Sequence, residues 1–205
     1  MKLLVFDTCL DKMYVVLRTE DKILSSKVVE NTESKYHSAF LISTIREVLT
    51  NNDTRPEDLD AIGINIGPGS FTGIRACTTV ARVMAQQLNL KAAGVSSLEI
   101  LSKTGGENPL VALDARKNKA YLYYDNEIKG AVDLEEVKEI ISKGNYDVIT
   151  DDRLQPVLGG KSYQAGDYPL GEILSDLVLE KLKNKSGNWA ELMPLYIQPP
   201  PVCQK

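Results

Sequence analysis

The segment Gly-Pro-Gly-Ser-Phe-Thr-Gly at residues 67–73 joins an apolar run to a long helical pattern. Such a turn exposes backbone N–H groups and the positive end of a helix dipole, and both attract anions. It is neither a Walker loop, because no Gly-Lys-Ser/Thr follows, nor a dinucleotide GxGxxG motif, because Thr72 stands where glycine is needed. The alternative interpretation is a tight turn in which Ser70 caps the helix and Gly73 allows close packing.

Asp7 and Asp114 each end an apolar run, so both are expected at the C-terminal ends of strands. Carboxylates at two equivalent strand ends could orient the phosphates and magnesium of a nucleotide. The turns that follow, residues 8–11 and 115–118, lack the glycine that lets backbone amides reach a phosphate. Alternatively, each carboxylate accepts hydrogen bonds from the N–H groups of its own turn. The residues predicted for an anion or nucleotide contact are Asp7, Thr8, Gly69, Ser70, Asp114 and Arg116.

The chain has one histidine, His37, and three widely spaced cysteines, Cys9, Cys77 and Cys203. No HExxH, CxxC or GxSxG motif accompanies them, so the sequence predicts no metal site and no catalytic residue. A Ser-His-Asp triad needs no fixed spacing, but a histidine at a helix start is typical of a surface or capping residue. An odd number of dispersed cysteines also indicates a reduced compartment.

The 205 residues are 43% hydrophobic and 25% charged, with a net charge of −4 and an isoelectric point near 5.2. This is an ordinary globular composition, and its acidity argues against a protein that binds nucleic acid on its own. The apolar run before Asp7 is too short for a signal-peptide core, and no apolar run approaches the roughly 18 residues of a membrane helix. We therefore expect a cytoplasmic protein without membrane contact.

The elements that position these residues follow a known order. Hydrophobic patterning predicts strands at 3–6, 13–17, 23–29, 61–66 and 92–95 and helices at 36–50, 71–89 and 96–105. A three-stranded antiparallel meander followed by β–α–β units is the ribonuclease-H-like order. Proteins of the actin/hexokinase/Hsp70 (ASKHA) class carry two such lobes.

The second half of the chain repeats this pattern in reduced form. Asp114, like Asp7, is followed by a tyrosine seven residues later, and a helix at 134–142 and a strand at 146–150 come next. We therefore predict an α/β protein with two ribonuclease-H-like lobes. The first covers residues 1–104, and a smaller, degenerate lobe covers residues 105–205.

The helix predicted near 71–88 is more apolar than one sheet requires. Its apolar side chains cover an arc of roughly 240°, whereas about 100° is enough to cover one sheet face. The surplus is covered by the helix at 36–50, by a partner subunit, or by both together. The predicted interface residues are Phe71, Ile74, Ala76, Val80 and Val83 in this helix and Leu41 and Ile45 in the other. Of these, the flank predicted to face the partner consists of Ala76, Val80 and Val83. In the alternative orientation of the helix, the flank with Phe71 and Ile74 faces the partner instead.

Residues 67–75, Gly-Pro-Gly-Ser-Phe-Thr-Gly-Ile-Arg, closely resemble the hallmark segment of the TsaB (YeaZ) family. Further matches in the family's order are Asp7-Thr8, His37, residues 94–98, residues 113–116 with Tyr121, and residues 194–196. The chain departs from the family in its reduced second lobe, in Gln198 where arginine is usual, and in its proline-rich tail.

The resemblance implies a non-catalytic scaffold, or pseudo-enzyme subunit. TsaB proteins pair with TsaD, which holds the metal and the active site and transfers a threonylcarbamoyl group to the adenosine beside the anticodon of tRNA. The ATPase TsaE joins them. The expected partners are therefore a TsaD homologue, a TsaE homologue and a second copy of the chain, with tRNA bound only within the complex.

The same resemblance implies no tightly bound cofactor, although a nucleotide could bind weakly at the interface. The alternative function is a small ASKHA-type ATP-dependent kinase.

Overall fold

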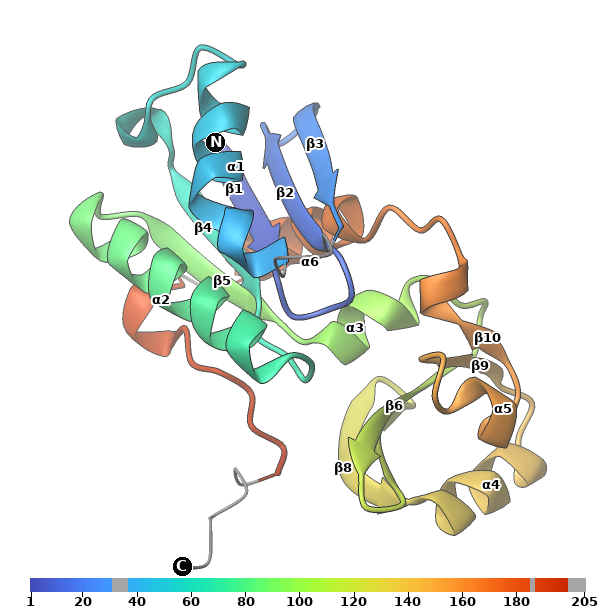
Figure 1. The fold of residues 1–205 in the computed structure, drawn as a ribbon. Helices are drawn as coiled ribbons and strands as arrows, with labels where there is room; N and C mark the ends of the chain where they lie inside the picture. Colours follow the sequence, from blue (N-terminus) through green and yellow to red (C-terminus); the bar gives the residue numbers. More distant parts are fainter. Residues whose placement is uncertain (31–36, 185–186, 199–205) are drawn as a thin grey trace, which may run out of the picture. The chain divides into compact units, whose positions relative to one another are not determined.

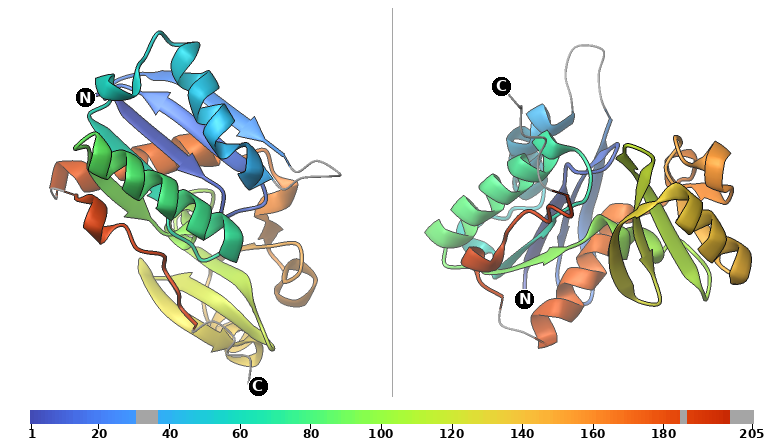
Figure 2. Two further views of the ribbon diagram at one scale, coloured as in Figure 1. Left: turned by 60° about the vertical axis from the view of Figure 1, so that its left-hand side comes forward. Right: turned by 90° about the horizontal axis from the view of Figure 1, so that it is seen from below.

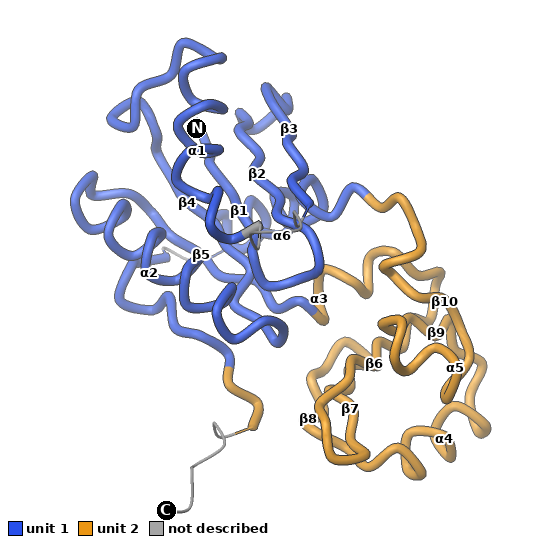
Figure 3. The backbone as a smooth tube through the Cα atoms, in the orientation of Figure 1, with its two compact units in different colours: residues 1–97, 169–195 blue, residues 98–168, 196–205 orange. Residues whose placement is uncertain are grey.

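The computed structural model describes residues 1–30, 37–184 and 187–198, and the chain divides into two compact units (Figure 3). The first unit comprises residues 1–97 and 169–195, and the second comprises residues 98–168 and 196–205. This division differs from the predicted lobes 1–104 and 105–205, because residues 169–195 return to the first unit.

The first unit is built on a five-stranded sheet in the order β3-β2-β1-β4-β5. Its strands are β1 (Leu3–Asp7), β2 (Met13–Arg18), β3 (Ile23–Val29), β4 (Ala61–Asn65) and β5 (Lys91–Val95). The first three pair antiparallel, with Val5 opposite Val16, whereas β4 and β5 run parallel to β1, with Leu4 opposite Ile62. The predicted meander is confirmed.

Helices cover both faces of this sheet (Figures 1 and 2). One face shares an apolar core with η1 (His37–Phe40), α1 (Leu41–Thr50) and α2 (Phe71–Gln87). The opposite face packs against α6 (Leu170–Asn184), where Val178 is so close to Gly63 of β4 that a Cβ there would lie 2.5 Å from it. Two short segments, η2 (Pro56–Asp58) and η4 (Trp189–Glu191), complete the unit. Covering both faces explains why every residue of β1 is buried.

The helix α6 lies outside the elements that the sequence pattern predicts, yet it closes the first unit. Arg18, at the end of β2, is buried, donates to the Ser175 hydroxyl at 2.8 Å and pairs with Asp176. Lys181 donates to the carbonyl oxygen of Gly94 on β5 at 3.3 Å. Polar contacts therefore hold α6 at both β2 and β5.

The second unit contains another five-stranded sheet, in the order β10-β9-β6-β7-β8. After α3 (Ser97–Ser102), its elements are β6 (Pro109–Arg116), β7 (Lys119–Tyr124), β8 (Glu127–Asp133), α4 (Leu134–Lys143), β9 (Asp147–Thr150), α5 (Gln155–Leu158), β10 (Lys161–Ser162) and η3 (Tyr163–Ala165). An antiparallel meander is again followed by two parallel strands. The α/β, ribonuclease-H-like fold class is confirmed, and the second sheet repeats the strand order of the first. Among the residues that the structure describes, no helix combines the length and the apolar character needed to cross a membrane.

Candidate functional site

A buried carboxylate, that of Asp7, ends β1. Oδ1 of Asp7 accepts a hydrogen bond from the backbone N–H of Cys9, and Oδ2 accepts one from the side-chain amide of Asn65 at 3.0 Å. The thiol of Cys9 donates to the carbonyl oxygen of Asn65 at 3.2 Å. Asp7 therefore has the turn N–H donor that the alternative interpretation of a strand-end carboxylate expects.

The glycine-rich segment 67–73 closes directly over this turn. A Cβ on Gly73 would lie 1.7 Å from the carbonyl oxygen of Thr8, and one on Gly69 would lie 2.3 Å from that of Cys9. Only glycine fits at either position, because a side chain would overlap the backbone of the turn. The Ser70 N–H donates to the Cys9 carbonyl oxygen at 2.8 Å, and the Thr8 hydroxyl donates to the Gly73 carbonyl oxygen at 2.7 Å.

The tight-turn interpretation is confirmed for two residues of this segment. Ser70 is the N-cap of α2, and its hydroxyl oxygen accepts the Gly73 N–H at 3.2 Å. Gly73 supplies the close packing that the interpretation requires. The Ser70 and Gly73 N–H groups already donate hydrogen bonds within the protein. An anion contact through Gly69 and Ser70 stays a prediction.

Asn65, at the end of β4, organises the same region and is absent from the predicted site residues. Its Oδ1 accepts hydrogen bonds from the Gly67 N–H at 2.8 Å and from the Ser97 hydroxyl at 2.9 Å. Gly67 has φ of +99°, a left-handed conformation that favours glycine, and turns the chain after β4. The signal that could have identified Asn65 is a polar residue that ends an apolar run just before a glycine-rich turn.

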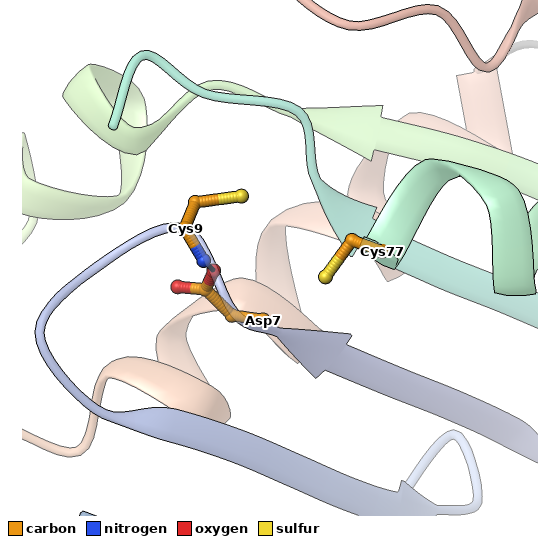
Figure 4. A group of neighbouring side chains, drawn as sticks. All are labelled: Asp7, Cys9 and Cys77. Carbon is orange, nitrogen blue, oxygen red and sulfur yellow. Dashed lines mark hydrogen bonds between the residues drawn. The ribbon is translucent and has the colours of Figure 1, made fainter. Parts of the chain in front are cut away.

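Asp7, Cys9 and Cys77 lie together in the interior of the first unit (Figure 4). The carboxylate oxygen and the two sulfur atoms all lie within 4.8 Å of one another. Cys77 Sγ accepts a hydrogen bond from the Thr8 N–H at 3.1 Å, and it also lies 3.1 Å from the Thr8 hydroxyl oxygen. Because the Thr8 hydroxyl donates its proton to the Gly73 carbonyl oxygen, the Cys77 thiol is the donor in this second contact. Burial raises the pKa of the Cys9 thiol well above its ordinary value, and the hydrogen bond with Cys77 and the charge of Asp7 act in the same direction.

Two cysteines that are far apart in the sequence lie close together in this cluster. The wide spacing of the cysteines predicts no metal, yet the fold brings Cys9, from the β1–β2 turn, next to Cys77 on α2. His37 begins η1, which agrees with its predicted place at a helix start, but its side chain and Cys203 lie outside the described residues.

In the second unit, Asp114 on β6 is held in a similar way. Its Oδ1 accepts the Arg116 N–H at 2.8 Å, and its own N–H donates to Asp151 Oδ2 at 2.7 Å. The guanidinium groups of Arg116 and Arg153 both lie 3.3 Å from Asp114 Oδ2. Asp151 and Arg153 are absent from the predicted site. They follow β9, the strand of the second sheet that corresponds to β4, which ends at Asn65. A nucleotide contact at Asp114 and Arg116 stays a prediction.

The surface of α2 carries apolar side chains, as predicted. Phe71 is 42% exposed and Val83 is 54% exposed, while Ala76 and Val80 are half-buried. The guanidinium of Arg75 lies 3.8 Å from the centroid of the Phe71 ring, so this aromatic residue is partly covered by a cation. Two large apolar side chains are therefore exposed on α2, Phe71 near its start and Val83 near its end. The exposed positions between them are polar, at Thr72, Arg75 and Thr79.

Three residues predicted for the interface do not lie on this surface. Leu41, Ile45 and Ile74 are buried in the core of the first unit, so they are not available to a partner. The reason is orientation, because α1 turns Leu41 and Ile45 towards the sheet and α2 turns Ile74 inward. The apolar side chain that α1 does expose is Ile42, which is 54% exposed and absent from the prediction.

Part of the apolar surplus predicted for α2 is covered within the first unit. Val80 packs against the core, and on another side the guanidinium of Arg82 lies 5.3 Å from the Trp189 ring centroid. Arg82 also donates to the carbonyl oxygen of Leu192 at 3.1 Å, next to η4. The interpretation that other parts of the same unit cover α2 thus holds in part, because η4 and η1 both contact α2. Burial by a partner subunit stays a prediction.

Comparisons with known proteins point to one family. The family model described as TsaD: tRNA N6-adenosine threonylcarbamoyltransferase matches residues 20–146. The chain is 32% identical over 124 residues to the tRNA threonylcarbamoyladenosine biosynthesis protein TsaB of Bacillus subtilis, a match that covers 59% of this chain and 53% of that protein. It is 27% identical over 165 residues to the protein of the same name from Escherichia coli, which covers 78% of this chain and 68% of that protein. The chain thus spans about half the length of the Bacillus subtilis relative.

A solved structure shares the fold. YeaZ from Pseudomonas aeruginosa matches with a TM-score of 0.73 at 23% identity, covering 95% of this chain and 99% of that chain. At this level of identity the likeness concerns the fold alone.

Proposed function

Because the chain belongs to the TsaD family of tRNA N6-adenosine threonylcarbamoyltransferases, as one of its TsaB (YeaZ) members, we propose that it acts in the biosynthesis of threonylcarbamoyladenosine in tRNA. In this role it is a non-catalytic scaffold that pairs with a TsaD homologue, which carries the active site. A TsaE homologue joins the pair, and tRNA binds only to the assembly. The scaffold role requires no tightly bound organic cofactor, and any nucleotide binds weakly at the interface.

The observation that carries this proposal is the exposure of two large apolar side chains on α2, the helix that begins within the family's glycine-rich segment. Exposed apolar patches on a folded chain mark interaction surfaces. These side chains are Phe71 and Val83, and Ile42 adds a further exposed apolar side chain on α1. The strand-end carboxylates, which an enzyme would present to its substrate, accept hydrogen bonds from their own turns instead.

The experiment that tests the interface is the substitution Val83→Glu. A specific interface buries about 1,600 Å² in total, and an unpaired charge within it costs several kcal/mol. We expect V83E to retain the melting temperature of the unmodified chain, because Val83 is 54% exposed. We expect its affinity for the TsaD homologue, measured by co-purification and calorimetry, to fall at least about a hundredfold, the change that several kcal/mol implies.

Val157→Glu is the matched control, because Val157 is 45% exposed on α5 of the second unit. This variant should bind the TsaD homologue as the unmodified chain does. A folded V83E chain with full affinity would show that α2 is not the interface. The same pair of variants, studied by sedimentation of the isolated chain, tests whether a second copy uses the same surface.

The alternative, a small ATP-dependent kinase, is favoured by the strand-end carboxylates alone. Asp7 is buried, and the turn that follows it contains no glycine. We therefore expect the pure chain to hydrolyse ATP weakly or not at all. Robust turnover that Asp7→Asn abolishes would replace the scaffold role with the kinase.

A further inference from the structure

We propose that Asp7, Cys9 and Cys77 form a binding site for one thiophilic divalent cation of the zinc type. Two sulfur atoms and a carboxylate oxygen are ligands that zinc prefers, and thiolates select it over magnesium and calcium. Asp7 is the last residue of β1, Cys9 lies in the turn that follows, and Cys77 lies on α2. The proposal is independent of the scaffold role, since it concerns the interior of the first unit.

The positions of the ligand atoms fit a cation. Three atoms that lie within 4.8 Å of one another share a centre no more than about 2.8 Å from each, and zinc bonds are about 2.0–2.3 Å long. Each ligand atom therefore has to move by less than about 1 Å, within the reach of side-chain rotation. The carbonyl oxygen of Asn65, 3.2 Å from the Cys9 sulfur, is the candidate for the fourth position.

Neighbouring groups already orient these ligands. The Asn65 amide donates to Asp7 Oδ2 at 3.0 Å, and the Thr8 N–H donates to Cys77 Sγ at 3.1 Å. Hydrogen bonds of this kind fix the ligands of protein metal sites and favour their charged forms. All three side chains are buried.

The charge of the cluster also permits binding. The cation forms one bond to each sulfur, each thiol loses its proton to solvent, and no electron is transferred. One divalent cation therefore replaces two protons, so the net charge buried around Asp7 stays the same. The usual cost of burying an additional charge is thus avoided. Binding would link the 7–9 turn to α2 and stabilise the first unit.

The test uses the full chain, reduced and treated with chelator, with Co²⁺ as the probe. We expect one Co²⁺ per chain and intense sulfur-to-cobalt charge-transfer absorption. Cys9→Ser and Cys77→Ser should each remove most of this absorption. Cys203→Ser, which changes the third cysteine of the sequence, is the matched control and should leave the absorption and the stoichiometry unchanged.

A second measurement needs no variant, in case a serine at a buried position prevents folding. X-ray absorption of the unmodified chain loaded with Zn²⁺ should show two sulfur neighbours at about 2.3 Å. Three results would overturn the proposal. They are a shell of nitrogen and oxygen neighbours only, no sulfur-to-cobalt absorption at saturating Co²⁺, or absorption that depends on Cys203 and not on Cys77.

Discussion

Among individual residues, the close packing around Asp7 depends on glycines, which have no side chain, and on polar residues that form hydrogen bonds. Gly69 and Gly73 let the start of α2 touch the backbone of the 7–9 turn, and Ser70 and Thr8 use that proximity for hydrogen bonds. The glycines of this segment are therefore explained by packing between two parts of the chain. A bound phosphate is not needed to account for them.

Gly73→Ala should destabilise the protein strongly. The added methyl group would meet the Thr8 carbonyl oxygen, a backbone atom that cannot rotate away. We expect the free energy of unfolding to fall by about 3 kcal/mol, as for severe overpacking. Thr72→Ala, at the neighbouring exposed position of α2, is the control and should change it little. A loss below about 1 kcal/mol for G73A in urea denaturation would contradict this close contact.

Two aspartates should have pKa values on opposite sides of the ordinary aspartate value. Hydrogen bonds from Arg55 lower the pKa of Asp58 to about 2, whereas burial raises the pKa of Asp151. Ionised Asp58 favours the folded state, so its contribution is present above the ordinary pKa and is lost as the pH falls towards 2. The stability contributed by Asp151 decreases as the pH rises from the ordinary pKa through its raised value.

Carboxyl NMR titration measures both groups in one experiment. Asp58 should have its midpoint near 2, and Asp151 should have its midpoint above that of an ordinary aspartate. Equal midpoints would show that the Arg55 contacts and the burial of Asp151 do not persist in solution.

At the scale of elements, α6 illustrates how a late segment completes an early sheet. Val178 packs against Gly63 of β4, and the buried Arg18 of β2 donates to Ser175. The pairing of Arg18 with Asp176 adds little by itself, because the Asp176 side chain is 69% exposed. The hydrogen bond from the buried Arg18 guanidinium to Ser175 is therefore the main polar link between α6 and β2.

Arg18→Met should loosen α6 while keeping most of the apolar stem. Hydrogen bonds to a charged group contribute about 2 kcal/mol, so we expect a loss of that order in the free energy of unfolding. Hydrogen exchange should accelerate along α6. Lys183→Met, at an exposed position of the same helix, controls for the change of residue type and should have little effect. Unchanged protection of α6 in R18M would show that apolar packing alone holds the helix.

At the scale of the whole molecule, the two sheets share one strand order, but the surroundings of the first strand end differ between them. In the first unit, the glycine-rich segment closes over Asp7, which is buried. In the second unit, the exposed guanidinium groups of Arg116 and Arg153 cover Asp114. The two units therefore share the strand order and the hydrogen bond from a turn N–H to the strand-end aspartate. The groups that cover this aspartate differ between the units.

Elements with local sequence patterns could be predicted from the residues alone. Strands β1 to β5, the helices α1 and α2, the cap at Ser70 and the internal repeat follow from hydrophobic period, turn residues and capping, which depend on neighbours along the chain. The glycine-rich segment was also long and specific enough to indicate the family.

Contacts between groups that are far apart in the sequence could not be predicted in this way. The approach of Cys9 to Cys77, the return of α6 to the first sheet and the burial of Ile74 each depend on other elements of the fold. Helix period assigns residues to a side of α2, but the sheet and η4 determine which side remains exposed. The physical reason is that burial and proximity arise from packing between distant segments, and no local pattern records which segments will pack together.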